Sequence, residues 1–132
     1  MANNEVFTSR DYIERLDKKF NIINGPIVDD CCGHGVWLKY AKDKGCEVWG
    51  CDIVPENCME TIKLLYGDGK IEYLTDNSIP ENMRCNGLKG IFTLDGEIVK
   101  NIVCADSMIW SFAVEYKTKS MLSKQVFNML FE

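Results

Sequence analysis

Apolar residues follow two spacings along this chain, one typical of helices and the other of buried strands. Four segments carry apolar residues three or four positions apart and are predicted to be helices: 8–20, 36–44, 55–66 and 120–131. Four others are short apolar runs and are predicted to be strands: 27–32, 46–53, 70–74 and 101–104. Strands therefore alternate with helices over much of the chain, which indicates an α/β fold.

Residues that begin and end elements separate these segments. Thr8 is a predicted N-cap, with Asp11 three positions later at the capping-box spacing. Gly45 suits the position that ends a helix, and Pro55 suits the first position of the next one. Asp95-Gly96 lies between two β-type runs and predicts a hairpin. The segment 75–90 is rich in turn-forming residues and is expected to be an irregular loop.

The order of the elements predicts a single domain, 1–132, with a parallel sheet and right-handed crossovers. Ligands of such folds bind at the carboxyl ends of the strands. Acids and glycines gather at those ends in this sequence: Asp29, Asp30, Gly33, Gly35, Asp52 and Asp106. Three strand ends that finish in acids are the main functional signal in the residues themselves.

Composition is that of an ordinary globular protein. Of the 132 residues, 46% are hydrophobic and 27% are charged, and no apolar run approaches the roughly 18 residues of a membrane span. The first residues lack the apolar core of a signal peptide, so we expect a cytoplasmic protein without a membrane segment. The net charge of −5 argues against a protein that binds nucleic acid alone, although a local basic patch is compatible with it.

The chain has seven cysteines. Their odd number and the missing signal peptide argue against a disulfide framework. No C-x-x-C pair is present, and the single histidine, His34, lies beside Cys31 and Cys32 in a turn too crowded for a zinc finger. We therefore expect most cysteines to be buried as small apolar side chains, with no metal site. Metal binding is the less favoured alternative.

The turn after the first predicted strand reads C-G-H-G-V-W-L. A dinucleotide fingerprint needs a third glycine where this turn has Leu38, and a phosphate-binding P-loop needs G-K-[ST], which is absent. Asp29 and Asp30 would oppose a phosphate but suit a ligand with cationic groups. S-adenosylmethionine fits, since it offers an ammonium and a sulfonium to carboxylates, a ribose diol to Asp52 and an adenine amine to Asp106.

The stretch VDDCCGHGVWL resembles motif I of class I S-adenosylmethionine-dependent methyltransferases, and most closely the D-P-x-C-G-S-G-x-x-L of N6-adenine DNA methylases of restriction–modification systems. VWGCDIVPEN resembles their motif II, NIVCADSM their motif III, and VFTSRDYIERL the F-T-P motif that precedes motif I. Together these motifs span 6–112 in the family's order. The resemblance implies a Rossmann-like methyltransferase fold with a shortened sheet and one hairpin. It also implies a site for S-adenosylmethionine or S-adenosylhomocysteine, formed by the matching positions: Phe7, Thr8, Asp29, Cys31, Gly33, His34, Gly35, Asp52, Ile53, Asp106 and Ser107.

The chain departs from the family at several positions. The proline of F-T-P is Ser9, the D-P of motif I is Asp29-Asp30, and the serine between the glycines is His34. Motif IV, N/D-P-P-Y, is absent because no two prolines are adjacent. In the family this motif holds the amine of a flipped-out adenine. We therefore expect a protein that binds S-adenosylmethionine but is incomplete for catalysis alone, and we assign no catalytic residue.

Alternatives stay open for the function and for single residues. The chain could instead be an active or split adenine-N6 DNA methyltransferase whose target-binding element comes from a complementary subunit, or a non-catalytic regulator or inhibitor that acts through protein–protein contact. Asp52 could be a solvated strand end, and Asp106 could serve a turn. Without a motif IV strand beside it, strand 27–32 would be an open edge, so we expect helix 120–131 or a second copy to cover it.

Overall fold

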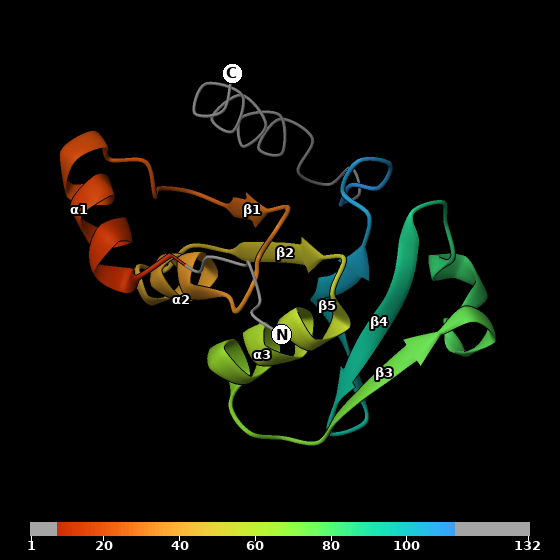
Figure 1. Ribbon diagram of the computed structural model, residues 1–132. Helices are drawn as coiled ribbons and strands as arrows, with labels where there is room; N and C mark the ends of the chain where they lie inside the picture. Colours follow the sequence, from red (N-terminus) through yellow and green to blue (C-terminus); the bar gives the residue numbers. More distant parts are fainter. Residues whose placement is uncertain (1–7, 113–132) are drawn as a thin grey trace, which may run out of the picture.

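The computed structural model describes residues 8–112, in which three α-helices and five strands form an α/β fold (Figure 1). The elements in chain order are α1 Arg10–Phe20, β1 Ile27–Asp29, α2 Val36–Asp43, β2 Val48–Asp52, α3 Pro55–Tyr66, β3 Ile71–Thr75, β4 Leu88–Leu94 and β5 Glu97–Ala105. The helix predicted for 120–131, and with it the proposed cover of the strand edge, lies outside the described residues.

The five strands form one mixed sheet in the order β1-β2-β5-β4-β3. Strands β1, β2 and β5 run parallel, whereas β4 and β3 are antiparallel to their neighbours. The expectation of a parallel sheet is therefore wrong for two strands. The reason is that the run 101–104 is not a separate strand but the continuation of the second hairpin arm. Strand β5 consequently pairs with β2 on one side and with its hairpin partner β4 on the other.

The hairpin between β4 and β5 turns at Asp95-Gly96, as predicted. Both residues have left-handed backbone angles, with φ of 51° at Asp95 and 87° at Gly96. Leu94 and Glu97 are the last paired residues on either side, so the loop has the two-residue form with positive φ at both positions. The twist of such a turn matches the twist of the strands that it joins.

The helix ends follow the predicted capping residues with one correction. Ser9, not Thr8, is the N-cap of α1: its backbone is extended, and its Oγ accepts a hydrogen bond from the N–H of Tyr12 at 3.3 Å. The helix begins one residue later than predicted, so the Thr8 cap is wrong. Gly45, with φ of 90°, follows α2, and Pro55 begins α3, as expected. No helix in the described part of the chain is long and apolar enough to cross a bilayer.

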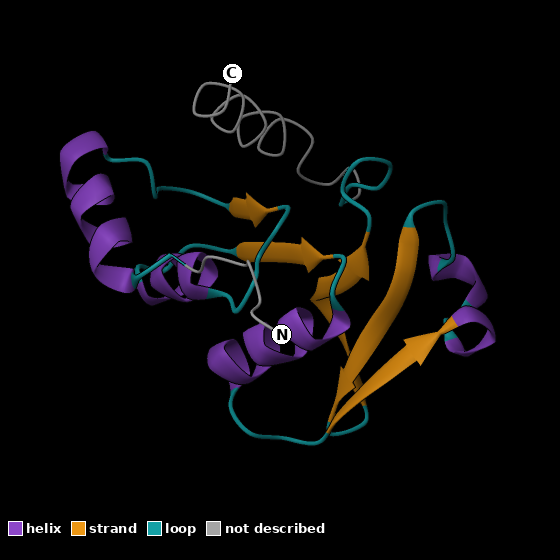
Figure 2. Ribbon diagram, viewed as in Figure 1, coloured by secondary structure: helices purple, strands orange, loops and turns teal. Residues whose placement is uncertain are grey.

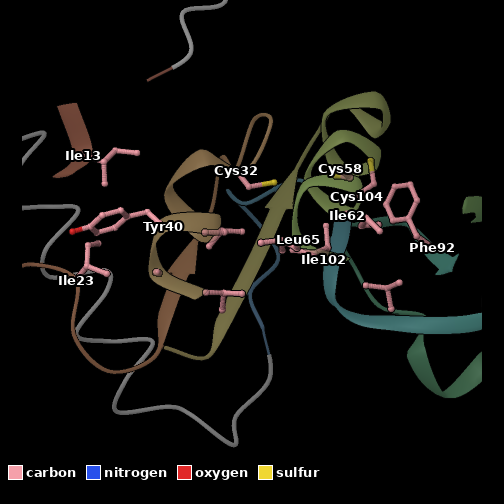
Figure 3. Close-up of a cluster of buried hydrophobic side chains, with 14 residues drawn as sticks. Ile13, Ile23, Cys32, Tyr40, Cys58, Ile62, Leu65, Phe92, Ile102 and Cys104 are labelled. Carbon is pink, nitrogen blue, oxygen red and sulfur yellow. The ribbon is translucent and has the colours of Figure 1, made fainter. Parts of the chain in front are cut away.

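Helices α2 and α3 pack on one face of the sheet (Figure 2), α2 against β1 and β2 and α3 against β2 and β5. Figure 3 shows the main core, which lies between these helices and the sheet and to which β5 contributes Ile102 and Cys104. The alternate residues of β5, Val103 and Ala105, belong to a second cluster. Because successive side chains of a strand point to opposite faces, this second cluster marks the face away from the two helices.

The segment 75–90 is irregular in its first part and then enters the sheet. Two short 3₁₀ turns, Asp76–Ser78 and Glu81–Met83, are tied together by Arg84. Its side chain donates to the carbonyl of Ile79 at 2.8 Å and to that of Asn77 at 3.0 Å. Ile79 is buried in the second cluster, so the loop packs on the face of the sheet opposite the helices. The last three residues of the segment already belong to β4, earlier than predicted.

A glycine in β2 brings α2 close to the sheet. A Cβ at Gly50 would lie 2.5 Å from Cδ1 of Leu38 and 3.1 Å from Cβ of Cys32. In a dinucleotide fingerprint the third glycine permits this close approach from the helix side. Here Leu38 occupies that position, and the glycine lies on the facing strand instead.

Asp17 joins the ends of α1 and α2. Its buried carboxylate accepts hydrogen bonds from the N–H of Ile23 at 2.9 Å, from the hydroxyl of Tyr40 at 2.7 Å and from Nζ of Lys44. Burial raises the pKa of Asp17, but the Lys44 ammonium and the other two donors outweigh it and hold the pKa below the ordinary value. The bond to Asp17 in turn raises the pKa of Tyr40 to about 12.

Candidate functional site

The carboxyl ends of three neighbouring parallel strands carry acids at one edge of the sheet. Strand β1 ends at Asp29, β2 ends at Asp52, and Asp106 directly follows β5. In the register, Asp29 pairs with Gly50 and Asp52 with Cys104, so the three ends are adjacent. This is the edge at which open α/β sheets bind ligands.

The loop between β1 and α2 is built on two left-handed glycines. Gly33 has φ of 54° and Gly35 has φ of 87°, a region that other residues adopt only with strain. The N–H of Cys32 still bonds to the carbonyl of Cys51 at 2.9 Å, and the N–H of Gly35 bonds back to the carbonyl of Cys32 at 2.8 Å. The loop therefore leaves the sheet as a tight turn and enters α2 directly.

Asp52 fastens this loop to the end of β2. Its Oδ2 accepts a hydrogen bond from the N–H of Gly33 at 3.0 Å. Its Oδ1 accepts from the N–H of Val54 at 2.9 Å and from Nδ2 of Asn57 at 3.4 Å. The residue is only 8% exposed, so Asp52 is not a solvated strand end. A carboxylate has about four acceptor positions, and donors among the described residues use three of them here.

Asp29 is partly buried beside this loop and is electrostatically disfavoured as an anion. Burial raises its pKa to about 6; the bond from the N–H of Cys31, at 3.1 Å, opposes the rise, while the charges of Asp30 and Asp52 add to it. Burial raises the pKa of the Cys31 thiol as well, and the charges of the same three acids raise it further. This edge of the sheet is therefore electronegative, and a cationic group would relieve the repulsion between its acids.

Two loops meet at this edge. The side chain of Ser107, after β5, lies near the thiol of Cys31, after β1, and opposes part of the rise that burial and the acids cause in the pKa of that thiol. Asp106 organises the turn after β5, because its Oδ1 accepts from the N–H of Met108 at 3.0 Å and its carbonyl accepts from the N–H groups of Ile109 and Trp110. The turn role considered for Asp106 is therefore present in the structure.

The remaining predicted residues occupy different environments. Ile53 and His34 are exposed, in the loops after β2 and β1 respectively. Thr8 is partly buried just before the cap of α1, and Phe7 lies outside the described residues. The structure thus places Asp29, Cys31, Gly33, Asp52 and Ser107 in one hydrogen-bonded and electrostatic neighbourhood.

Two polar residues of α3 belong to the site and were not predicted. Thr61 and Asn57 are buried and one helical turn apart, so they point the same way. Thr61 donates from Oγ1 to the carbonyl of Gly33 at 2.8 Å, and Asn57 donates to Asp52. The available signal was their position beside Cys58 and Ile62, since a polar residue on the apolar stripe of a helix needs a buried partner.

Most described cysteines are structural. Cys32, Cys51, Cys58 and Cys104 are buried and Cys46 is half-buried, whereas Cys31 and Cys85 are exposed. Burial, with nearby acids and sulfurs, raises the pKa of Cys51 far above the ordinary value, and interactions with the sulfurs of Cys104 and Cys32, together with burial, do the same for Cys58, so these two are inert thiols. Among residues 8–112, no group of three or more His, Cys, Asp or Glu side chains is arranged to hold a metal ion.

A shallow hollow of about 350 Å³ lies at the opposite edge of the sheet, near the start of β2. Its lining includes Lys42, Trp49, Tyr66 and Asn101. The amide of Asn101 there bridges the carbonyl of Val48, at 3.0 Å, and the hydroxyl of Tyr66. This hollow contains none of the residues at the carboxyl edge, so it is separate from the candidate site.

Compared with known proteins, the chain matches no family model, no curated protein and no solved structure.

Proposed function

We propose that the carboxyl edge of β1, β2 and β5 binds S-adenosylmethionine, in a domain equivalent to the cofactor-binding half of a class I methyltransferase related to N6-adenine DNA methylases. One observation carries the proposal: the hydrogen bond between the N–H of Gly33 and the carboxylate of Asp52 joins the two motifs that resemble the family's motifs I and II. The acid of one motif thus lies against the glycine loop of the other, as a shared nucleoside site requires.

The charge at this edge favours S-adenosylmethionine over a dinucleotide. The charges of Asp30 and Asp52 raise the proton affinity of Asp29, and a pyrophosphate would add more negative charge to the same place. An ammonium or a sulfonium would instead lower the pKa of Asp29 and be bound in return. The loop also lacks the third glycine of a dinucleotide fingerprint, because Leu38 occupies that position and packs on Gly50.

We assign the ends of the ligand to particular residues. The methionine ammonium lies near Asp29 and the ribose hydroxyls donate to the carboxylate of Asp52. The adenine lies over Ile53 toward Asp106 and Ser107, and the glycine loop, with Cys31 and His34, flanks the sulfonium. Binding of this kind uses existing carboxylates and requires little rearrangement of the Gly33 turn.

Catalysis is assigned to a partner. These 132 residues contain no two adjacent prolines and so do not supply N/D-P-P-Y. Three large apolar side chains are exposed at the same edge, with fractional exposures of 55% for Ile53, 88% for Met108 and 58% for Ile109. Exposed apolar groups beside a ligand site favour a protein surface that closes over it. This favours, as a second candidate, a split adenine-N6 methyltransferase completed by another subunit or a second copy, in the cytoplasm.

Calorimetry of the purified chain with S-adenosylmethionine, S-adenosylhomocysteine and NAD tests the proposal. We expect saturable binding of the first two and none of NAD. Asp29→Asn keeps the acceptor for Cys31 but removes the charge, and should weaken S-adenosylmethionine roughly 10- to 100-fold, in line with the loss of one charged hydrogen bond. Asp68→Asn, in an exposed turn after α3, is the control and should bind like wild type. Absence of binding to both sulfur ligands would contradict the proposal.

A further inference from the structure

Thr61 contacts the glycine loop at two points from helix α3. Its side chain is fully buried, and its Oγ1 donates to the carbonyl of Gly33 at 2.8 Å. Gly35 lies flat against the same residue: a Cβ there would be 2.8 Å from Cγ2 of Thr61 and 3.1 Å from its Cα. The loop backbone therefore rests directly on this one position of α3.

The hydroxyl of Thr61 is committed to the loop rather than to its own helix. Threonine within a helix commonly bonds to the carbonyl one turn earlier. Here the single hydroxyl hydrogen has a short acceptor in the carbonyl of Gly33 at 2.8 Å, whereas Sγ of Cys32 is farther away at 3.6 Å. The bond spans 28 positions of sequence and joins α3 to the loop between β1 and α2.

Both polar backbone groups of Gly33 are therefore hydrogen-bonded, each to a different residue. Its N–H bonds to Asp52 and its carbonyl to Thr61. Asn57, one turn before Thr61 on the same helix, also bonds to Asp52. The loop, the end of β2 and the first turns of α3 thus form one hydrogen-bonded unit around the left-handed Gly33.

We propose that Thr61 is a positioning residue, which holds the Gly33–Gly35 loop in its binding conformation before a ligand arrives. This inference rests on the proposed S-adenosylmethionine site and deepens it. A loop that is already ordered loses less conformational freedom on binding, so affinity rises without any contact between Thr61 and the ligand. Removing the hydroxyl should loosen the loop and weaken binding, mainly through faster dissociation.

The test compares Thr61→Val, which keeps the shape but removes the hydroxyl, with Thr61→Ser, which keeps the hydroxyl. Thr93→Val, at a buried threonine of β4, is the matched control. Thr61→Val should raise the hydrogen-exchange rates of the Gly33 and Gly35 amides and weaken S-adenosylmethionine binding roughly fivefold to tenfold. Thr61→Ser and Thr93→Val should stay close to wild type in both measurements. If Thr61→Val does not fold, Thr61→Ala and Thr93→Ala take their places.

Two results would overturn the inference: unchanged exchange and affinity in Thr61→Val, or equal weakening by Thr61→Val, Thr61→Ser and Thr93→Val, which would indicate packing alone. Failure of the proposed function gives a different pattern. In that case wild type binds no S-adenosylmethionine, while the exchange rates of Gly33 and Gly35 still report whether Thr61 holds the loop.

Discussion

Asp29 should reduce the stability of the fold at neutral pH, and replacing it with asparagine should raise that stability. The partly buried carboxylate lies beside Asp30 and Asp52, and within the described part of the chain it accepts a hydrogen bond from the N–H of Cys31. Asparagine keeps an oxygen for that N–H and has no charge to bury. Acidic side chains that destabilise the folded protein are typical of ligand sites, because a bound ligand offsets the destabilisation.

The magnitude follows from the pKa. Asp29 titrates at about 6 in the folded chain, against about 3.9 in an unfolded one. Because the folded pKa is the higher, the neutral form stabilises the fold below about pH 4, and this stability is lost as the pH rises through about 6. A difference of about two pH units corresponds to about 3 kcal/mol. The portion due to Asp30 and Asp52 falls with added salt, whereas the portion due to burial does not.

Thermal unfolding followed by circular dichroism at pH 4, 5, 6 and 7.5 measures this directly. The midpoint of Asp29→Asn minus that of wild type should increase by roughly 10 °C from pH 4 to pH 7.5, for a domain of this size. Asp68→Asn removes a negative charge from an exposed turn and controls for net charge. A difference between Asp29→Asn and wild type that stays constant from pH 4 to pH 7.5 would refute the reasoning.

Three further substitutions test the packing and hydrogen bonds of the fold. Asp17→Asn should lower the free energy of unfolding by roughly 2–4 kcal/mol at pH 7. Because the folded pKa of Asp17 is lowered, its contribution to stability is present above about pH 4 and is lost as the pH falls. Urea titrations of wild type and variant should therefore converge in acid, and an equal difference in stability at pH 3 and pH 7 would contradict this. Gly50→Ala should lower the free energy of unfolding by about 1–3 kcal/mol, because the added Cβ would meet Leu38. Adding Leu38→Val should recover part of that stability. If urea titrations instead show that the two substitutions destabilise additively, the contact is not the cause. Gly96→Ala should cost about 1 kcal/mol by backbone strain alone, since nothing lies within 4 Å of the added Cβ; an unchanged urea midpoint would mean that the turn has relaxed.

Local signals in the sequence were sufficient to predict most elements. Asp95-Gly96 specified a two-residue turn because positive φ at both positions is rare outside such pairs. Gly45 and Pro55 marked a helix end and a helix start for similarly local reasons. The cap of α1 moved by one residue because Thr8 and Ser9 both carry capping hydroxyls, and sequence alone does not choose between them.

The path of β5 required information beyond the local pattern. The run 101–104 was predicted to be a separate strand, yet β5 is continuous from Glu97 to Ala105. Asn101 is accommodated because its amide bonds to the carbonyl of Val48 and to the hydroxyl of Tyr66, on other elements. That pairing depends on β5 lying beside β2, so the mixed sheet could not be predicted from the run itself.

The candidate site was predictable as a set of strand ends but not as a set of contacts. The positions of Asp29, Gly33 and Asp52 followed from the order of the elements. The bond between Gly33 and Asp52 depends on the pairing of β1 with β2, and the bonds of Thr61 and Asn57 to these two residues depend on the packing of α3 on β2 and β5. Apolar spacing assigned α3 a core role and gave no separate weight to its two buried polar residues.

The most direct test of the account is an amide NMR titration of the ¹⁵N-labelled chain with S-adenosylmethionine. Binding at the proposed site should shift the amide signals of Cys31, Gly33, Gly35 and Val54 saturably, and should leave those of Trp49 and Tyr66 at the opposite edge unchanged. Either no saturable shift, or shifts confined to the residues around Trp49 and Tyr66, would contradict the claim that the carboxyl edge of the sheet binds S-adenosylmethionine.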